Sequence, residues 1–334
     1  MPGINDALDP ELAAAFAAMP KAANGTLLEL SDIPGLRARM RAARAHLAPA
    51  PADPRVTIET LRIPRADRTE LDVVLYRPAG AEHALPALVW FHAGAQVLGD
   101  DARDDDAYHT ALALDLGCVL AAVVYRLAPE TPAPGAAEDG YLAYTHLVEH
   151  AAEHRIDPHR IGLAGASGGG APAAATALMV RDRQAVRPCS LSLLYPMLDD
   201  RLETPSSFEA ASEVVFARTD IRLAWAAVLG DRLDTDDVHP YSAPGRATDL
   251  AGLPDTFVAV AQFDLLRDEG IDFARRLTAA GVPVDLHLYA RAFHAWDRFA
   301  ATSALARSFE QTWHAFLRRT LHSRFPAVRN GAQR

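Results

Sequence analysis

A serine flanked by glycines stands where a strand-like run gives way to an alanine-rich, helix-like stretch. The pentad is Gly165-Ala166-Ser167-Gly168-Gly169. A sharp strand-to-helix turn needs glycines beside the serine, because a Cβ atom there would collide in so tight a bend. The turn lifts the hydroxyl off the backbone beside a helix N-terminus, whose free N–H groups favour the negative charge of an acyl-transfer intermediate. The pattern therefore predicts that Ser167 is a nucleophile.

A serine nucleophile needs a base within hydrogen-bond reach and an acid that orients the base. Asp264 ends the strand-like run 256–264, and His294 follows the next such run, 284–290. Carboxyl ends of parallel strands meet at one edge of a sheet, so these side chains can converge on the serine. The chain order Ser167, Asp264, His294 predicts a catalytic triad.

Neighbouring acids and histidines are expected to have other roles. Asp268 and Glu269 are expected to charge the first turn of the helix that begins there. His287 is expected within a strand, on its core or its surface face, and His314 on the solvated face of the last helix. These four residues are therefore not expected to belong to the triad.

Backbone N–H groups must also stabilise the oxyanion that forms during acyl transfer. One donor is expected to be the N–H of Gly168, the residue after the nucleophile. The other donors are expected in the loop after the third strand, which reads WFHAGAQVLGD over residues 90–100.

The elements that must position these residues alternate along the chain. Strand-like runs occupy 56–63, 71–78, 87–94, 119–127, 160–165, 190–198, 256–264 and 284–290, and helix-like runs occupy about 135–153, the stretch after Ser167, about 267–280 and about 297–320. This alternation predicts an α/β fold with a mainly parallel sheet and helices on both faces. The segment from about 199 to 250 interrupts the alternation, and an insertion of that length is predicted to form part of a lid.

The first fifty or so residues are alanine-rich and helical in pattern. Leu27, Leu28, Leu30, Ile33, Leu36 and Met40 are spaced to form apolar stripes on such helices. The Ala-Pro-Ala-Pro-Ala stretch at 48–52 is typical of a linker.

Composition bounds the class of protein. The 334 residues, half of them apolar and 23% charged, suit one large α/β domain or two small ones. A net charge of -10 argues against partners such as nucleic acid or anionic membrane surfaces. Cys118 and Cys189 lie in apolar runs and are expected to be buried thiols in a reducing compartment. With an acidic N-terminus and no run of about 18 apolar residues, a cytoplasmic protein without a membrane span is expected.

Ordered blocks of sequence between about residues 70 and 300 resemble the hormone-sensitive-lipase group of bacterial esterases, within the α/β-hydrolase fold. The blocks are HAGAQVLGD (92–100), YRLAPETPAPGAAEDG (125–140), GASGGG (165–170), YPMLDD (195–200), FDLLRDEG (263–270) and FHAW (293–296). The resemblance implies hydrolysis of carboxylic esters with no metal and no cofactor. It also implies that the N–H groups of Gly94, Ala95 and Gly168 form the oxyanion hole. Members of the group are often dimers, so a homodimer is an expectation.

The resemblance also implies a helical cap over the site. The expected division is N-terminal cap helices at 1–50, a catalytic α/β domain at 51–198 and 231–325, a cap insertion at 199–230, and a tail at 326–334. Within the catalytic part, His92 is expected to brace the oxyanion loop. Tyr125, Arg126, Glu130 and Asp139 are expected to pack and hydrogen-bond beneath the site.

Four positions depart from the pattern of the group. Ala93 and Ala95 replace glycines of the oxyanion loop, so either the loop avoids positive φ there or it is strained. Ala166 replaces the usual acidic residue before the nucleophile, and Leu265 replaces a proline often found after the triad acid.

These observations predict a serine carboxylesterase for short- to medium-chain esters, with an acyl-enzyme at Ser167. The same triad could serve a lactone, a carbamate, an acyl transfer or an elimination, because a fold does not fix the reaction. A ligand-binding protein on an inactive hydrolase scaffold is a further alternative, although such proteins usually lose the serine or the histidine.

Overall fold

An eight-stranded sheet runs through the molecule in the order β1-β2-β4-β3-β5-β6-β7-β8. The computed structural model describes residues 4–46, 53–99, 102–209 and 214–322. β1 and β2 join the sheet antiparallel, and β4, β3, β5, β6, β7 and β8 pair in parallel, which confirms the mainly parallel sheet. The strands are β1 (Val56–Pro64), β2 (Glu70–Pro78), β3 (Leu85–Phe91), β4 (Val119–Val123), β5 (Ile156–Ala166), β6 (Leu191–Leu194), β7 (Thr256–Phe263) and β8 (Val284–Phe293).

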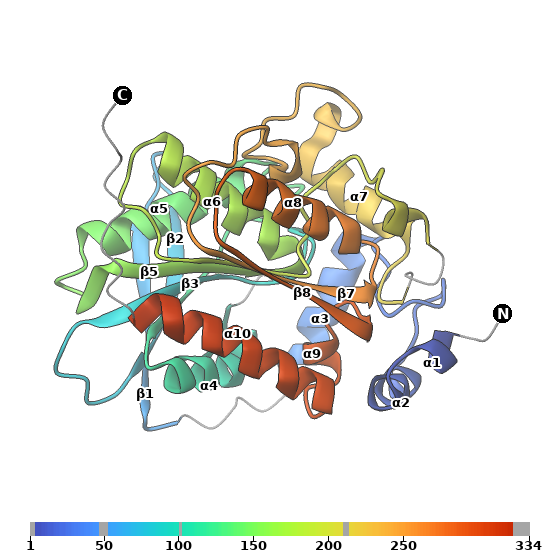
Figure 1. Ribbon diagram of the computed structural model, residues 1–334, viewed down its shortest axis with the longest axis horizontal. Coiled ribbons are helices and arrows are strands. Elements are labelled where there is room, and N and C mark those ends of the chain that lie inside the picture. Colours follow the sequence, from blue (N-terminus) through green and yellow to red (C-terminus); the bar gives the residue numbers. More distant parts are fainter. Residues whose placement is uncertain (1–3, 47–52, 100–101, 210–213, 323–334) are drawn as a thin grey trace.

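Helices cover both faces of the sheet (Figure 1). α4 (Asp106–Leu116), α9 (Trp296–Phe299) and α10 (Ala304–His322) lie on one face, and α5 (Gly135–Glu149), α6 (Gly170–Asp182) and α8 (Arg267–Ala279) lie on the other. Every residue of β3, β4 and β6 is buried, as expected of strands enclosed between two helical layers. In α10, Phe309, Trp313 and Phe316 are buried at helical spacing, so this helix is held by one apolar face.

Several element boundaries differ from those predicted. β3 ends at Phe91 and β4 at Val123, so the apolar residues that follow them belong to loops rather than to strands. The predicted last helix is two helices, α9 and α10, separated by a turn. These differences lie next to the strand ends, where the chain leaves regular structure to form the site.

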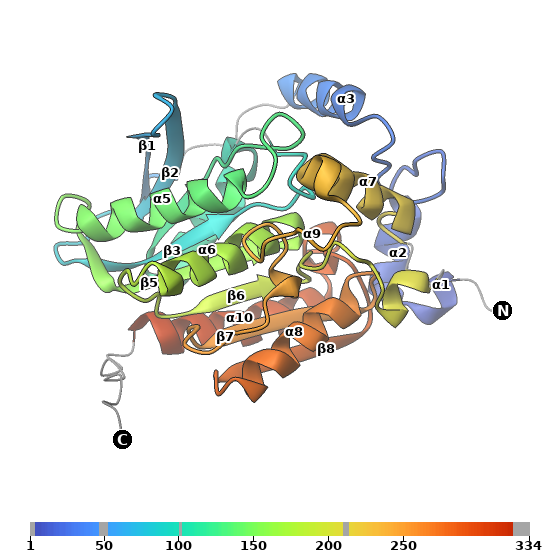
Figure 2. The same cartoon turned by 90° about the horizontal axis from the view of Figure 1, so that it is seen from above.

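Segments from the two predicted cap regions meet at one end of the molecule (Figure 2). They contain α1 (Ile4–Ala7), α2 (Pro10–Ala18) and α3 (Ile33–Ala45) from the first region and α7 (Arg218–Leu229) from the second. Leu28 donates its N–H to the Val215 carbonyl at 2.7 Å, and Leu30 donates to Asp220 Oδ1 at 2.8 Å.

The prediction that Leu27, Leu28 and Leu30 lie on a helix is wrong. They lie in an irregular segment before α3, where the backbone N–H groups of Leu28 and Leu30 bond the second cap region. The division into cap and catalytic parts stays a prediction. Its proposed linker at 48–52 and its tail at 326–334 lie outside the described residues.

Cys118 and Cys189 are free thiols, and burial raises the pKa of both to about 12, which makes them poor nucleophiles. Among the residues that the structure describes, none of the helices combines the length and apolarity that crossing a bilayer requires. The cytoplasmic location and the homodimer stay predictions.

Candidate active site

The serine turn forms where β5 passes into α6. β5 ends at Ala166, Ser167 adopts a φ of 52°, and a short 3-10 turn leads into α6 at Gly170. A Cβ atom at Gly165 would lie 2.1 Å from the Gly169 carbonyl oxygen. The close backbone approach is the feature that the glycines were expected to permit, and the positive φ at the serine was not predicted.

The structure brings Ser167, His294 and Asp264 into one hydrogen-bonded chain. Ser167 Oγ lies 2.8 Å from His294 Nε2, and His294 Nδ1 lies 2.7 Å from Asp264 Oδ2. Asp264 follows β7, His294 follows β8 and Ser167 follows β5, so all three occupy strand carboxyl ends. A carboxylate on Nδ1 keeps the proton on that nitrogen, which leaves Nε2 free to accept the serine proton.

Packing fixes the imidazole and the carboxylate in place. Asp264 is fully buried, and its second oxygen, Oδ1, accepts the N–H of Leu266 at 2.9 Å. The rings of Tyr195 and Phe216 meet the His294 ring edge-on, with centroids 5.0 Å and 4.7 Å away. The three triad side chains are almost shielded from water, so their electrostatic interactions are stronger than in solvent.

The two rival acids lie at the start of α8, but only one behaves as expected. Asp268 accepts the N–H of Ser206 at 2.8 Å. Glu269 is buried, and its Oε1 accepts the N–H of Leu198 at 2.6 Å. Burial raises the pKa of Glu269 well above its usual value, which disfavours the charge that was expected of it on this turn.

The two rival histidines have partners of their own. His287, in β8, stacks on Phe257 with centroids 5.1 Å apart. His314 pairs with Asp115 at 2.6 Å, and its side chain is only 16% exposed, so the expectation of a solvated face is wrong. His322 of α10 makes a further hydrogen bond, to the Leu116 carbonyl of α4, so α10 packs closely on α4 here.

The loop after β3 lies directly against the residue that follows the serine. Gly168 has no room for a side chain, since a Cβ atom would lie 2.3 Å from Ala95 N and 2.7 Å from Gln96 N. The N–H groups of Gly94 and Ala95 donate to no acceptor found in the described parts of the chain. Within the described residues, these donors therefore lie beside the nucleophile with their hydrogen-bonding capacity unused.

Ala95 keeps a left-handed backbone conformation although it replaces a glycine. Ala95 has a φ of 52° and Gln96 a φ of 61°, while Ala93 lies outside that region. A left-handed conformation costs a residue with a Cβ atom about 1–2 kcal/mol relative to the right-handed one. Of the two alternatives for Ala95, the structure thus shows the strained one.

The block beneath the loop holds it by stacking and hydrogen bonds. The rings of His92 and Tyr125 stack with centroids 4.1 Å apart, and Tyr125 donates its hydroxyl to the His92 carbonyl at 2.8 Å. Asp139 is buried and accepts the Arg126 N–H at 2.9 Å and Arg65 Nε at 2.7 Å. His92 therefore acts as a brace, in line with its expected role.

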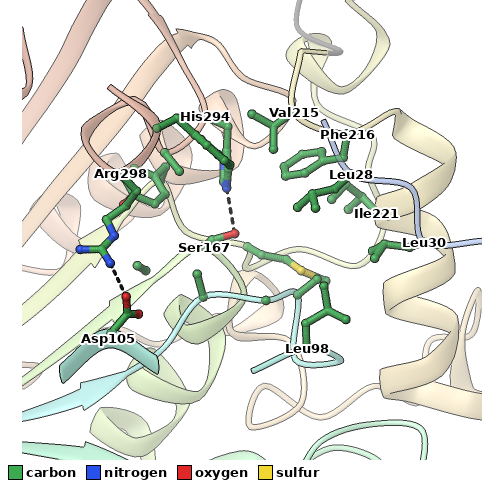
Figure 3. Close-up of a pocket in the computed structure, with 18 of the residues that line it drawn as sticks. Leu28, Leu30, Leu98, Asp105, Ser167, Val215, Phe216, Ile221, His294 and Arg298 are labelled. Carbon is green, nitrogen blue, oxygen red and sulfur yellow. Dashed lines mark hydrogen bonds and ion pairs between the residues drawn. The ribbon is translucent and has the colours of Figure 1, made fainter. Parts of the chain in front are cut away.

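A cavity of about 280 Å³ opens onto Ser167 and extends to both sides of it (Figure 3). One side is apolar and is lined by Leu28, Leu30, Leu98, Val215, Phe216 and Ile221. The other side ends at an ion pair between Arg298 and Asp105. Sequence reasoning did not single out this pair, because neither residue belongs to a motif.

Comparison with known proteins decides the family. A family model described as the alpha/beta hydrolase fold matches residues 88–298. Carboxylesterase NlhH of Mycobacterium tuberculosis is 35% identical over 290 residues, which cover 86% of this chain and 89% of the relative. The chain belongs to the hormone-sensitive-lipase-like esterases of the α/β hydrolase fold.

Two further similarities extend over most of the esterase. Carboxylic ester hydrolase LipN of Mycobacterium tuberculosis is 36% identical over 260 residues, covering 76% of this chain and 68% of the relative. The solved structure of a bacterial heroin esterase matches with a TM-score of 0.88 and 37% identity, over 95% of this chain and 99% of that one. The protein is a carboxylic ester hydrolase.

Nothing in the described segments suggests a metal centre in this esterase: three or more His, Cys, Asp or Glu side chains are nowhere grouped so that they could hold an ion.

Proposed function

We propose that this esterase hydrolyses carboxylic esters through an acyl-enzyme on Ser167. Ser167 Oγ attacks the ester carbonyl carbon while His294 Nε2 takes the hydroxyl proton, and Asp264 stabilises the imidazolium that forms. The N–H groups of Gly94, Ala95 and Gly168 donate to the oxyanion. His294 then gives its proton to the leaving alcohol and later takes one from the water that releases the acid.

The hydrogen bond of 2.8 Å between Ser167 Oγ and His294 Nε2 carries this proposal. It is supported by the buried Asp264 on the other ring nitrogen and by unused N–H donors beside the serine. The test is the Ser167→Ala variant, assayed with p-nitrophenyl acetate. We expect kcat to fall by at least about 10⁴-fold, since loss of the nucleophile removes the acyl-enzyme route. Retention of full hydrolysis would refute the assignment.

We further propose that short acyl chains suit the cavity better than long ones. Its 280 Å³ are at the small end for ligand sites, and the Arg298–Asp105 pair closes one end of it. An alkyl chain that reached this pair would remove its water without replacing the lost hydrogen bonds. A panel of p-nitrophenyl esters from acetate to decanoate tests this, with kcat/KM expected to peak at six carbons or fewer.

The double variant D105A/R298A shows whether the ion pair sets that limit. Removing the pair should raise kcat/KM for octanoate relative to acetate by about tenfold, the worth of one or two additional buried methylene groups. An unchanged ratio would show that the limit lies elsewhere in the cavity.

A further inference from the structure

Arg37, in the N-terminal helix α3, makes direct hydrogen bonds to the loop that carries the oxyanion donors. Its Nε donates to the Val97 carbonyl at 2.6 Å, two residues after Ala95. Its Nη2 donates to the Ala128 carbonyl at 2.6 Å, and its Nη1 donates to Glu130 Oε1 at 2.7 Å. Only 12% of the Arg37 side chain is exposed, so water screens its bonds to the two carbonyls little, whereas the Glu130 side chain is 65% exposed.

The two backbone carbonyls that Arg37 binds belong to segments that are themselves joined. The N–H of Ala128 donates to the Gln96 carbonyl at 3.0 Å. Gln96 lies between Ala95 and Val97, so the guanidinium closes a ring of hydrogen bonds around the back of the oxyanion loop. Because a guanidinium is planar and presents several donors at fixed angles, it can set the distance between two backbone segments.

The loop needs such support because its conformation is costly. Ala95 and Gln96 both have positive φ, and a strained segment persists only where its surroundings hold it. The N–H groups of Gly94 and Ala95 make no bond of their own that would fix the loop within the described chain. The Gly94 carbonyl accepts the N–H groups of Val97 and Leu98, which sets the orientation of the Gly94–Ala95 peptide. The bonds of Arg37 support this turn at Val97 and at the neighbouring segment.

The helix that carries Arg37 packs on the edge of the core. No residue of α3 is fully buried, and Ile33 and Leu36 pack against the core. The hydrogen bonds of Arg37 connect this helix directly to the loop that carries the oxyanion donors. A change in the docking of α3 is therefore expected to reach the oxyanion loop through this side chain.

We propose that Arg37 is a positioning residue, which couples the docking of the N-terminal cap helix to the alignment of the oxyanion donors. This proposal rests on the proposed function of Ser167 and the loop. It predicts an effect on the transition state rather than on the bound ester, because the donors stabilise charge that exists only after attack on the carbonyl.

The test compares R37M and R37K with the wild type and with R39M. Arg39 lies on the same helix and is 65% exposed, and its partner among the described residues is Asp32, at 3.7 Å, which makes it a matched control. With p-nitrophenyl acetate, we expect R37M to lower kcat by about 30-fold with KM within about threefold, since a small misplacement of catalytic groups costs up to about 10²-fold. R37K should recover part of kcat, and R39M should stay within about twofold of wild type.

A transition-state analogue provides the readout that a merely structural role would not move. An alkyl trifluoromethyl ketone forms a tetrahedral oxyanion with the serine, so its Ki should weaken in R37M by the same factor as kcat/KM falls. Urea unfolding of each variant gives the folded fraction under assay conditions.

Arg37 has no positioning role if R37M loses activity only in proportion to its folded fraction, if KM alone rises, or if Ki stays at the wild-type value. If the ketone fails to inhibit wild type at all, the proposed function fails instead.

Discussion

The triad and the oxyanion loop line the same cavity, but they are held in different ways. Ser167, Asp264 and His294 follow β5, β7 and β8 of one sheet and are fixed by bonds to one another and by the packing around them. The oxyanion loop has strained residues at Ala95 and Gln96 and is held from outside, by Gly168 and by Arg37. One half of the site is built into the sheet, whereas the other depends on distant parts of the chain.

The largest effect is expected on the triad side, from His294→Ala. Ser167 would lose its base, so kcat should fall by about 10⁴-fold or more, with no loss of folding cooperativity in urea. H287A is the matched control, because His287 lies on β8, the strand that His294 follows, but contacts Phe257 instead of the triad. If H294A and H287A had equal effects, His294 would not be the base.

A smaller effect is expected where the two halves touch, from Gly168→Ala. The new Cβ atom would lie 2.3 Å from Ala95 N, so the loop must move away from the serine. We expect kcat to fall by about 10²-fold, which is typical for loss of one oxyanion donor. Stopped-flow measurement of p-nitrophenol release separates acylation from later steps, and acylation itself should be slowed. An unaltered acylation rate would mean that the loop does not supply the donors.

Asp297, which lies behind the triad, is expected to make the free energy of unfolding depend on pH. Asp297 is buried beside Tyr195, whose ring contacts His294, and burial raises the pKa of Asp297 to about 6. Its neutral form therefore stabilises the fold fully below the unfolded-state pKa near 4, and this contribution is lost as pH rises to about 6. D297N has no such loss. The free energy of unfolding of D297N minus that of wild type should therefore be about 2 kcal/mol larger at pH 7.5 than at pH 4.5.

Urea unfolding at the two pH values measures this difference, and R275Q, at an exposed surface pair, serves as the control. A constant difference between D297N and wild type at both pH values would show that Asp297 does not titrate in this range.

The smallest effect is expected from Ala95→Gly, which relieves strain in the loop without moving it. Glycine adopts a φ of 52° freely, so the free energy of unfolding should rise by up to about 1 kcal/mol, less the greater entropy of glycine in the unfolded chain. Because the donors keep their places, kcat for p-nitrophenyl acetate should stay within about threefold of wild type. A large loss of kcat would mean that the Ala95 methyl group itself positions the substrate.

The same contrast explains what could be predicted from the sequence. The triad side chains lie at the ends of apolar strands and beside glycines, and both signals are local in the chain. Arg37 has no such signal, because it is one of 33 basic residues and its partners lie some sixty and ninety residues away. The burial of Glu269 and the positive φ of Ala95 depend on tertiary packing, which spacing does not encode.

The central claim is that one serine, activated by His294, forms the acyl-enzyme. Incubation with diethyl p-nitrophenyl phosphate, followed by intact mass and peptide mapping, tests it most directly. We predict one diethylphosphoryl group per wild-type chain, on the peptide that contains Ser167, and none on S167A, with labelling of H294A slowed by orders of magnitude. A label on any other residue, or a wild-type protein without a label, would contradict the account.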